Sequence, residues 1–372
     1  MKFTANRESL LRILGVAQDI ISEKSPLSVL SNVYLKTDKA NNKVVVKCSN
    51  LKVEATTSFP AEIEEEGETT AYCEKLVRII SALPNGDVKF SGGDSELTIK
   101  PESKKASFKV NCLSTDKFPE IRGFDDNGAF KFPAKEFKEM VKSTIFAVSN
   151  DINRYFMSGV FFTKHEGKPI MVATDGRRMS FRFENIEVPD FAPAIIPTQI
   201  LNLISKVCPS EGDITINIKD KIFCFKGHGF EFISTLIDAQ YPNWQRVIPQ
   251  GLDHTISVAK TEFVEAIKRV GVMLSKKSTI QFVVEPGKMT VVVPKTEIGQ
   301  ADEEISANYN GEKVEITVNS EYLNDVLTDI NGDTVSMEFK LNQENKVSAA
   351  IVIKDNDTAK VNCTHLVMPM QI

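Results

Sequence analysis

The chain has 372 residues, of which 42% are hydrophobic and 26% charged, a balance typical of a globular protein with large buried cores. Its 45 Lys and Arg residues against 50 Asp and Glu residues give a formal net charge of −5, which excludes a protein that coats nucleic acid through its overall charge. There is no apolar run of the roughly 18 residues that a membrane span needs and no signal-peptide pattern, so we expect a soluble, cytoplasmic protein.

The first predicted helix follows a short strand that begins near Phe3, and the same pattern recurs from Phe130 and from Ile256. In each case an apolar strand residue is followed, seven positions later, by the first apolar residue of a helix. The apolar residues that follow are spaced by three, four and seven positions, which places them on one buried helix face. The equivalent positions are Leu10, Ile13, Leu14 and Ile20; Phe137, Met140, Val141 and Ala147; and Phe263, Ala266, Ile267 and Met273.

A second helix is predicted in each repeat, and each ends close to a Gly-Asp pair. Its apolar stripe consists of Leu76, Ile79, Ile80 and Leu83; of Ile200, Leu203, Ile204 and Val207; and of Leu323, Val326, Leu327 and Ile330. The pairs are Gly86-Asp87, Gly212-Asp213 and Gly332-Asp333, and strand-like alternation follows each of them. We expect the glycine to supply the left-handed residue that ends the helix.

The rest of the chain consists of short apolar or alternating runs that predict strands. Two helices among many strands, repeated about every 125 residues, indicate an α+β domain used three times. The turn-rich segments around residues 124–128 and 250–253 predict the boundaries, giving domains at 1–124, 125–251 and 252–372.

The sequence offers no pattern for a metal, a cofactor or a disulfide framework. Its six cysteines show no CxxC spacing and its four histidines lie in four separate segments, so we expect reduced, buried thiols and no metal site. None of the patterns GxxxxGK[ST], GxSxG and HExxH occurs either. The run from Asp175 to Arg178 is compatible with an acidic and basic active site, but Asp-Gly after an apolar run favours a tight turn.

Basic residues lie on the repeated helices, whereas acidic residues gather in runs such as 62–68 and 302–304. Lys138 and Lys142 share one helix face, and Lys268 and Arg269 occupy the matching place in the third repeat. Ordinary solvated helix faces explain any one of these pairs equally well. If the equivalent helices line one side of an assembly, however, they would contact phosphates without reading bases.

Four stretches resemble one family from end to end of the chain: residues 1–4 (MKFT), 173–179 (ATDGRRM), 241–249 (YPNWQRVIP) and 367–372 (VMPMQI). The family is the bacterial DNA polymerase III beta subunit, the sliding clamp. The resemblance implies three domains in each chain, each with two helices packed on antiparallel sheets. It also implies a head-to-tail homodimeric ring that encircles double-stranded DNA, acts as a processivity factor and catalyses no reaction.

The resemblance further implies a pocket that binds QLxLF-like peptides of the DNA polymerase III alpha subunit, the clamp loader and repair polymerases. Carried over by position, the pocket comprises Met157, Thr174, Gly176, Arg177, Arg178, Met179, Pro242, Arg246, Val247, Leu366, Met368, Pro369 and Met370. Thioethers and aliphatic side chains suit an adaptable apolar groove, with arginines to fix a polar peptide end. Arg177 stands where His is frequent, and Met157 and Met179 where Leu is frequent, which bears on peptide preference. For residues 368–370 the alternative is a frayed terminus.

The same resemblance implies DNA contacts by Lys24, Arg154 and Tyr155, to which the helix positions add Lys138, Lys142, Lys268 and Arg269. At the seam of the ring, Phe108 and Val110 would pack against Met273 and Leu274 of the neighbour, and Lys75 would face the acidic run 302–304. Two alternatives remain at this point. One is a hydrolase or lyase built on Asp175 with Arg177 and Arg178; the other is a clamp paralogue without a role in replication.

Overall fold

The computed structural model describes residues 1–21, 28–93, 95–274, 279–297, 299–355 and 362–370. The chain forms two compact units: the first contains residues 1–138 and 196–236, and the second contains residues 139–195 and 237–372. Neighbouring strands run antiparallel in both units. Among the described residues, no helix is both long and apolar enough to cross a membrane.

The first unit is built on a 13-stranded sheet with the order β10-β15-β16-β17-β4-β3-β2-β6-β9-β8-β7-β1-β5. The elements of the first repeat are β1 (Lys2–Asn6), α1 (Arg7–Ile20), η1 (Ser28–Ser31), β2 (Asn32–Asp38), β3 (Lys43–Ser49), β4 (Val53–Pro60), β5 (Glu62–Glu65), β6 (Glu68–Tyr72), α2 (Cys73–Ala82), β7 (Asp87–Gly92), β8 (Glu96–Pro101), β9 (Phe108–Leu113) and η2 (Thr115–Lys117). The elements of the second repeat in this unit are β10 (Phe130–Pro133), α3 (Ala134–Ile145), α4 (Thr198–Val207), β15 (Asp213–Lys219), β16 (Ile222–Gly227) and β17 (Phe230–Thr235). The residues of α3 from Glu139 onward belong to the second unit. The pairing of β17 with β4 joins the first two repeats edge to edge.

The second unit contains an eight-stranded sheet, β14-β11-β12-β13-β25-β24-β23-β18, and a four-stranded sheet, β21-β20-β19-β22. Its elements are η3 (Ile152–Met157), β11 (Gly159–His165), β12 (Lys168–Thr174), β13 (Arg178–Phe183), β14 (Ala194–Pro197), η4 (Trp244–Val247), β18 (His254–Ala259), α5 (Lys260–Gly271), β19 (Thr279–Glu285), β20 (Lys288–Thr296), β21 (Gly299–Ser306), β22 (Val314–Asn319), α6 (Ser320–Asp329), β23 (Thr334–Phe339), β24 (Ile351–Asp355) and β25 (Cys363–Val367). Here β13 pairs with β25, which joins the second and third repeats.

One hydrogen bond recurs at the start of the first helix of every repeat. The N–H group of the first helical residue donates to the carbonyl of the turn that precedes the partner strand: Arg7 to Gly86 at 3.1 Å, Ala134 to Gly212 at 2.9 Å and Lys260 to Asp333 at 2.8 Å. This bond satisfies one of the N–H groups that a helix leaves unpaired at its N-terminus. The sequence repeat is therefore a repeat of backbone geometry.

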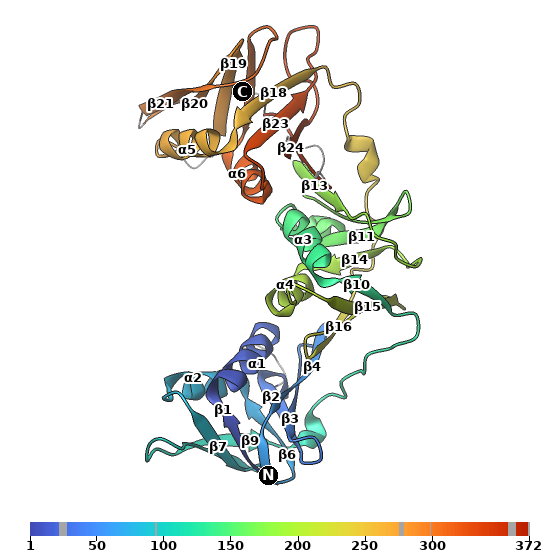
Figure 1. Ribbon diagram of the computed structural model, residues 1–372, viewed down its shortest axis with the longest axis vertical. Helices are drawn as coiled ribbons and strands as arrows, with labels where there is room; N and C mark the ends of the chain where they lie inside the picture. Colours follow the sequence, from blue (N-terminus) through green and yellow to red (C-terminus); the bar gives the residue numbers. More distant parts are fainter. Residues whose placement is uncertain (22–27, 94, 275–278, 298, 356–361, 371–372) are drawn as a thin grey trace. The chain divides into compact units, whose positions relative to one another are not determined.

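The predicted helix faces are the buried ones. In α1 and α2, which contact each other (Figure 1), the stripe residues are almost completely buried except Ile79, which is half-buried. The four stripe residues predicted for α4 are buried as well, and so are the four predicted for α6. Met273 is the exception in the third repeat: α5 ends at Gly271, so this residue lies beyond the helix and is half-buried.

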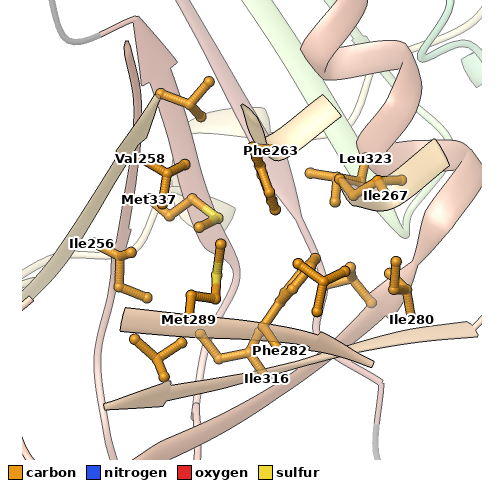
Figure 2. Close-up of a cluster of buried hydrophobic side chains, with 14 of the residues drawn as sticks. Ile256, Val258, Phe263, Ile267, Ile280, Phe282, Met289, Ile316, Leu323 and Met337 are labelled. Atoms are coloured by element: carbon orange, nitrogen blue, oxygen red, sulfur yellow. The ribbon is translucent and has the colours of Figure 1, made fainter. Parts of the chain in front are cut away.

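The third repeat shows how such a face forms a core. Figure 2 shows side chains from α5, α6 and the surrounding strands pointing into one apolar cluster, among them Phe263, Leu323 and Met289. The ring of Phe263 is completely buried, and its centroid lies 5.4 Å from that of Phe282. Burial of aromatic and aliphatic side chains on this scale is the main source of stability of each repeat.

The expected role of the Gly-Asp pairs was wrong. The residues that end α2, α4 and α6 are Leu83, Cys208 and Ile330, and all three have extended backbone conformations. Gly86 (φ +122°) and Gly212 (φ +84°) use positive φ in the turn before the next strand, whereas Gly332 is not among the residues with positive φ. The glycines thus serve the turn, not the helix end.

Candidate functional site

The hairpin between β12 and β13 presents the first part of the site. The carboxylate oxygen Oδ1 of Asp175 accepts the N–H groups of Arg177 at 2.8 Å and Arg178 at 2.9 Å, and the Thr174 hydroxyl donates to the Arg178 carbonyl at 2.7 Å. Gly176 has a φ of +85°, which favours glycine. The segment is therefore a tight turn, as its Asp-Gly pair predicts. The turn leaves the Arg177 side chain exposed.

Arg178, the next residue, has a different environment. Its guanidinium donates to Asp175 Oδ2 at 3.2 Å, to Asp325 Oδ2 at 2.5 Å and to the Phe146 carbonyl at 2.6 Å. It also lies 4.5 Å from the centroid of the Tyr322 ring, and its side chain is only 11% exposed. These contacts tie the hairpin to α6 and to the end of α3, so Arg178 positions the hairpin and its donors are largely engaged.

Below the hairpin lies an apolar floor that includes two of the predicted pocket residues. Met179 on β13 is paired in register with Leu366 on β25, and both are buried. They belong to one cluster with Val172, Tyr241 and Trp244, so the segment 241–249 contacts the two strands through its aromatic side chains. Met157, at the end of η3, is also buried.

Exposed apolar side chains belong to the same segments. Val247 is 57% exposed, Met368 47% and Met370 42%, which is unusual for large hydrophobic residues. Arg246 is exposed, whereas Pro242 and Pro369 are half-buried. Such side chains can be covered by an apolar ligand without rearrangement of the core.

The last described residues are held in place. The N–H group of Met368 donates to the Arg177 carbonyl at 2.9 Å, and that of Met370 donates to the Thr317 carbonyl at 2.7 Å. The alternative of a frayed terminus was therefore wrong for residues 368–370. These two bonds fix Met368 beside the hairpin and Met370 beside β22.

A cavity of about 260 Å³ lies next to the apolar floor formed by Met179 and Leu366. Most of the residues that line it were not among the site residues predicted from the sequence. It is lined by Phe161, Thr163, Lys164, His165, Tyr241, Pro242, Asn243, Trp244 and Gln245. The imidazole of His165 contacts the Trp244 ring edge to face, with centroids 5.4 Å apart. The alternation of β11 places Phe161, Thr163 and His165 on one face, and this was the only sequence signal for them.

The residues expected at DNA belong to several elements. Arg154 and Tyr155 are exposed on η3, and Arg154 donates to the Asp175 carbonyl at 3.2 Å. Lys142 on α3 is exposed, and Lys138 is half-buried. Lys268 is exposed at the end of α5, where Arg269 binds Glu303 at 2.6 Å and Glu265 at 3.3 Å. Hydrogen bonds to these carboxylates raise the pKa of Arg269 and balance its charge. Lys24 lies outside the described residues.

The residues expected at the ring seam are on the surface or just beneath it. Lys75 is exposed on α2, Phe108 on β9 is half-buried and Val110 is buried. Met273 and Leu274 pack against the core of the third repeat. Of the acidic run expected opposite Lys75, Glu303 binds Arg269, and Glu304 binds Lys288 at 2.8 Å.

Among the described residues, one group of side chains is arranged so that it could hold a metal ion: Asp329, Cys363 and His365. Asp329 and His365 are buried, and Cys363 is half-buried. Burial alone would lower the pKa of His365, but the neighbouring Cys363 and Asp329 outweigh it and raise the pKa to about 9. No sequence pattern indicates this group, because Asp329 is far from the other two residues along the chain.

The comparisons with known proteins agree along the whole chain. Three consecutive family profiles match: the N-terminal domain of the DNA polymerase III beta subunit at residues 1–122, its central domain at 131–243 and its C-terminal domain at 245–371. A curated protein of Treponema pallidum named beta sliding clamp is 32% identical, with all of both chains aligned. Two solved structures also cover all of both chains at a TM-score of 0.91. They are sliding clamps bound to griselimycin, one from Bartonella birtlesii (27% identical) and one from Pseudomonas aeruginosa (25% identical).

Proposed function

The chain belongs to the DNA polymerase III beta subunit family, and we infer that it works as a closed ring that carries a polymerase along DNA. It is a sliding clamp, a processivity factor of DNA polymerase, and it is not an enzyme. The observation that carries this conclusion is the end-to-end match to three successive domain profiles and to a relative named beta sliding clamp.

The ring is formed by two copies of the chain, head to tail. A heterologous contact closes into a ring only when the rotation between subunits fits, and three similar domains in each of two chains satisfy this condition. The proposed domains are 1–124, 125–251 and 252–372, and the matched ranges of the three profiles support them. The seam places Phe108 and Val110 of one copy against Met273 and Leu274 of the next, with Lys75 facing the acidic residues 302–304.

Duplex DNA passes through the ring, and the ring does not recognise its base sequence. Lys138, Lys142 and Lys268 are the basic helix residues that contact phosphates, together with Arg154, Tyr155 and Lys24. Arg269 contributes less, because Glu303 and Glu265 already balance its charge. Such contacts are weak, sensitive to salt and independent of sequence. The protein therefore remains on DNA through its topology, and it acts where the chromosome is, in the cytoplasm.

Partners bind through a short peptide at the hairpin and the C-terminal segment. The exposed Val247, Met368 and Met370 supply apolar contacts, and the buried Met179 and Leu366 support the surface from beneath. Arg177 and Arg246 are exposed and can bind the polar or acidic end of the peptide. The remaining members, Met157, Thr174, Gly176, Arg178, Pro242 and Pro369, shape or support this surface. The partners are the DNA polymerase III alpha subunit, the clamp loader and repair polymerases that carry QLxLF-like motifs.

A titration of a fluorescent QLxLF-type peptide with the full-length protein tests the peptide site. Anisotropy should rise and saturate, and the fluorescence of Trp244, the only tryptophan, should change in parallel. A variant that lacks residues 368–372 should lose the binding, because the exposed methionines are removed. Glu344→Ala, an exposed residue on the loop before β24, serves as the matched control and should bind as the wild type does.

Two results would overturn the peptide site. One is the absence of saturable binding to the full-length protein, and the other is equal binding by the truncated protein. Either result would leave the family membership intact, because that rests on the whole chain.

A further inference from the structure

Asp329, Cys363 and His365 meet where the last residue of α6 contacts β25. Cys363 and His365 are two positions apart on the strand, so their side chains lie on the same face. Asp329 Oδ2 lies 3.4 Å from His365 Nε2 and 3.7 Å from Cys363 Sγ, and Sγ lies 3.5 Å from Nε2. A carboxylate, a thiol and an imidazole thus form a nearly equilateral triangle of ligand atoms.

This triangle has the size of one face of a tetrahedral zinc site. Zinc bonds to oxygen, nitrogen and sulfur of about 2.0, 2.05 and 2.3 Å at tetrahedral angles place the ligand atoms about 3.3 to 3.6 Å apart. The three observed separations fall within about 0.2 Å of those values. An ion held by these three atoms keeps a fourth position for water.

Neighbouring hydroxyl groups hold two of the three ligands in the orientation that a metal requires. The Ser180 hydroxyl donates to the Ser143 carbonyl, so it can only accept at its 2.9 Å contact with His365 Nδ1. The Nδ1 atom therefore carries a proton, and Nε2 is the atom directed at Asp329 and Cys363. The Ser143 hydroxyl donates to Asp329 Oδ1 at 3.1 Å, which leaves Oδ2 for the ion. Hydrogen bonds of this kind from outside the ligand set are typical of metal sites.

The charges also balance. A tetrahedral zinc site takes Cys as a thiolate, His as a neutral imidazole and Asp as a carboxylate, so the two negative charges of these ligands match the two positive charges of the ion. The guanidinium of Arg182 lies 3.3 Å from the Ser143 hydroxyl and is paired with Glu184 at 2.7 Å and Glu139 at 3.5 Å. Its charge is therefore offset by carboxylates outside the group.

We propose that Asp329, Cys363 and His365 bind one zinc ion in each chain. The ion links the end of α6 to β25, the strand that carries Leu366 and continues into the methionines of the peptide surface. Its ligands are one thiolate, one neutral imidazole and one carboxylate, a set that suits zinc better than the harder magnesium and calcium ions. This proposal is independent of peptide binding.

Cobalt substitution tests the site in the full-length protein. The protein is reduced, stripped of metal with a chelator and titrated with Co²⁺. One equivalent should produce the near-ultraviolet charge-transfer band of a cobalt-thiolate bond, and Zn²⁺ should abolish it. Cys363→Ser should lose the band, whereas Cys208→Ser, which removes a buried thiol in the first unit, should keep it. The absence of the band from the wild-type protein, or an equal band in both variants, would overturn the proposal.

A second measurement needs no variant and therefore does not depend on how well Cys363→Ser folds. Cys363 is half-buried whereas the other five cysteines are buried, so iodoacetamide should alkylate it first. One equivalent of Zn²⁺ should slow this alkylation, measured by peptide mass spectrometry, by about tenfold or more, because the bound thiolate no longer attacks. An unchanged rate would contradict zinc binding at this thiol, even if ions bind elsewhere on the acidic surface.

Discussion

Replacing each of two adjacent arginines by alanine should have different effects on the stability of the protein. Arg178 makes three hydrogen bonds and stacks on Tyr322, whereas Arg177 is exposed. We therefore predict that Arg178→Ala destabilises the protein, and that Arg177→Ala leaves stability unchanged but weakens peptide binding.

The size of the loss follows from the partners of Arg178. The Phe146 carbonyl would lose its charged donor, which costs about 1 to 3 kcal/mol when the acceptor is not rehydrated. The contact with Tyr322 contributes about 0.5 to 2 kcal/mol, and the pair with Asp325, whose side chain is 41% exposed, adds at most about 1 kcal/mol. Asp175 keeps its two backbone N–H partners, so it adds little. We expect a total of about 3 kcal/mol, equivalent to roughly 6 to 12 °C in the Tm of the second unit.

Thermal unfolding followed by calorimetry, with urea unfolding as a second probe, measures both variants against the wild-type protein. Arg177→Ala should remain within about 0.5 kcal/mol, as exposed positions usually do. If Arg178→Ala unfolds at the wild-type temperature, or if Arg177→Ala is destabilised as strongly, the assignment of a positioning role to Arg178 alone is refuted.

Three further predictions concern the core, the hairpin and DNA. Phe263→Ala should lower the free energy of unfolding by about 3 to 5 kcal/mol, measured in urea, because the ring is completely buried; a loss below about 1 kcal/mol would contradict this packing. Gly176→Ala should cost about 1 to 2 kcal/mol because of its positive φ, while Gly123→Ala, with nothing within 4 Å of the added methyl group, should cost nothing measurable in the same assay. Lys138→Glu combined with Lys142→Glu should weaken salt-dependent DNA binding measured at low ionic strength, and equal binding by the double variant would remove α3 from the DNA surface.

Much of the fold could be predicted because its helices repeat. Each apolar stripe is a local pattern, so the spacing of apolar residues alone predicts the buried faces of α1, α3 and α5. Leu10 and Phe263, the first stripe residues of α1 and α5, are both buried. Met273 was placed on such a face because spacing cannot show that a helix has already ended at Gly271. The glycine turns were misassigned for a similar reason: a Gly-Asp pair marks a turn, but its sequence does not tell whether the helix or the following strand requires it.

The candidate site was predictable only in part. Residues 173–179 and 241–249 carry recognisable patterns, but the partners of Arg178 come from α3 and α6, far away in the sequence. The cavity beside Trp244 and the group of Asp329, Cys363 and His365 depend on which strands and helices meet. Such contacts between distant segments have no local signature, so only the folded chain reveals them.

The central claim is that the protein stays on DNA by encircling it, and retention on circular and linear DNA tests this most directly. The protein is loaded by a clamp loader onto nicked circular plasmid, separated from free protein by gel filtration at high salt, and measured before and after one restriction cut. A ring should remain on the circle and slide off the cut molecule, because its contacts with phosphates are too weak to hold it in salt. Equal retention on circular and linear DNA would contradict the account and would indicate binding by affinity.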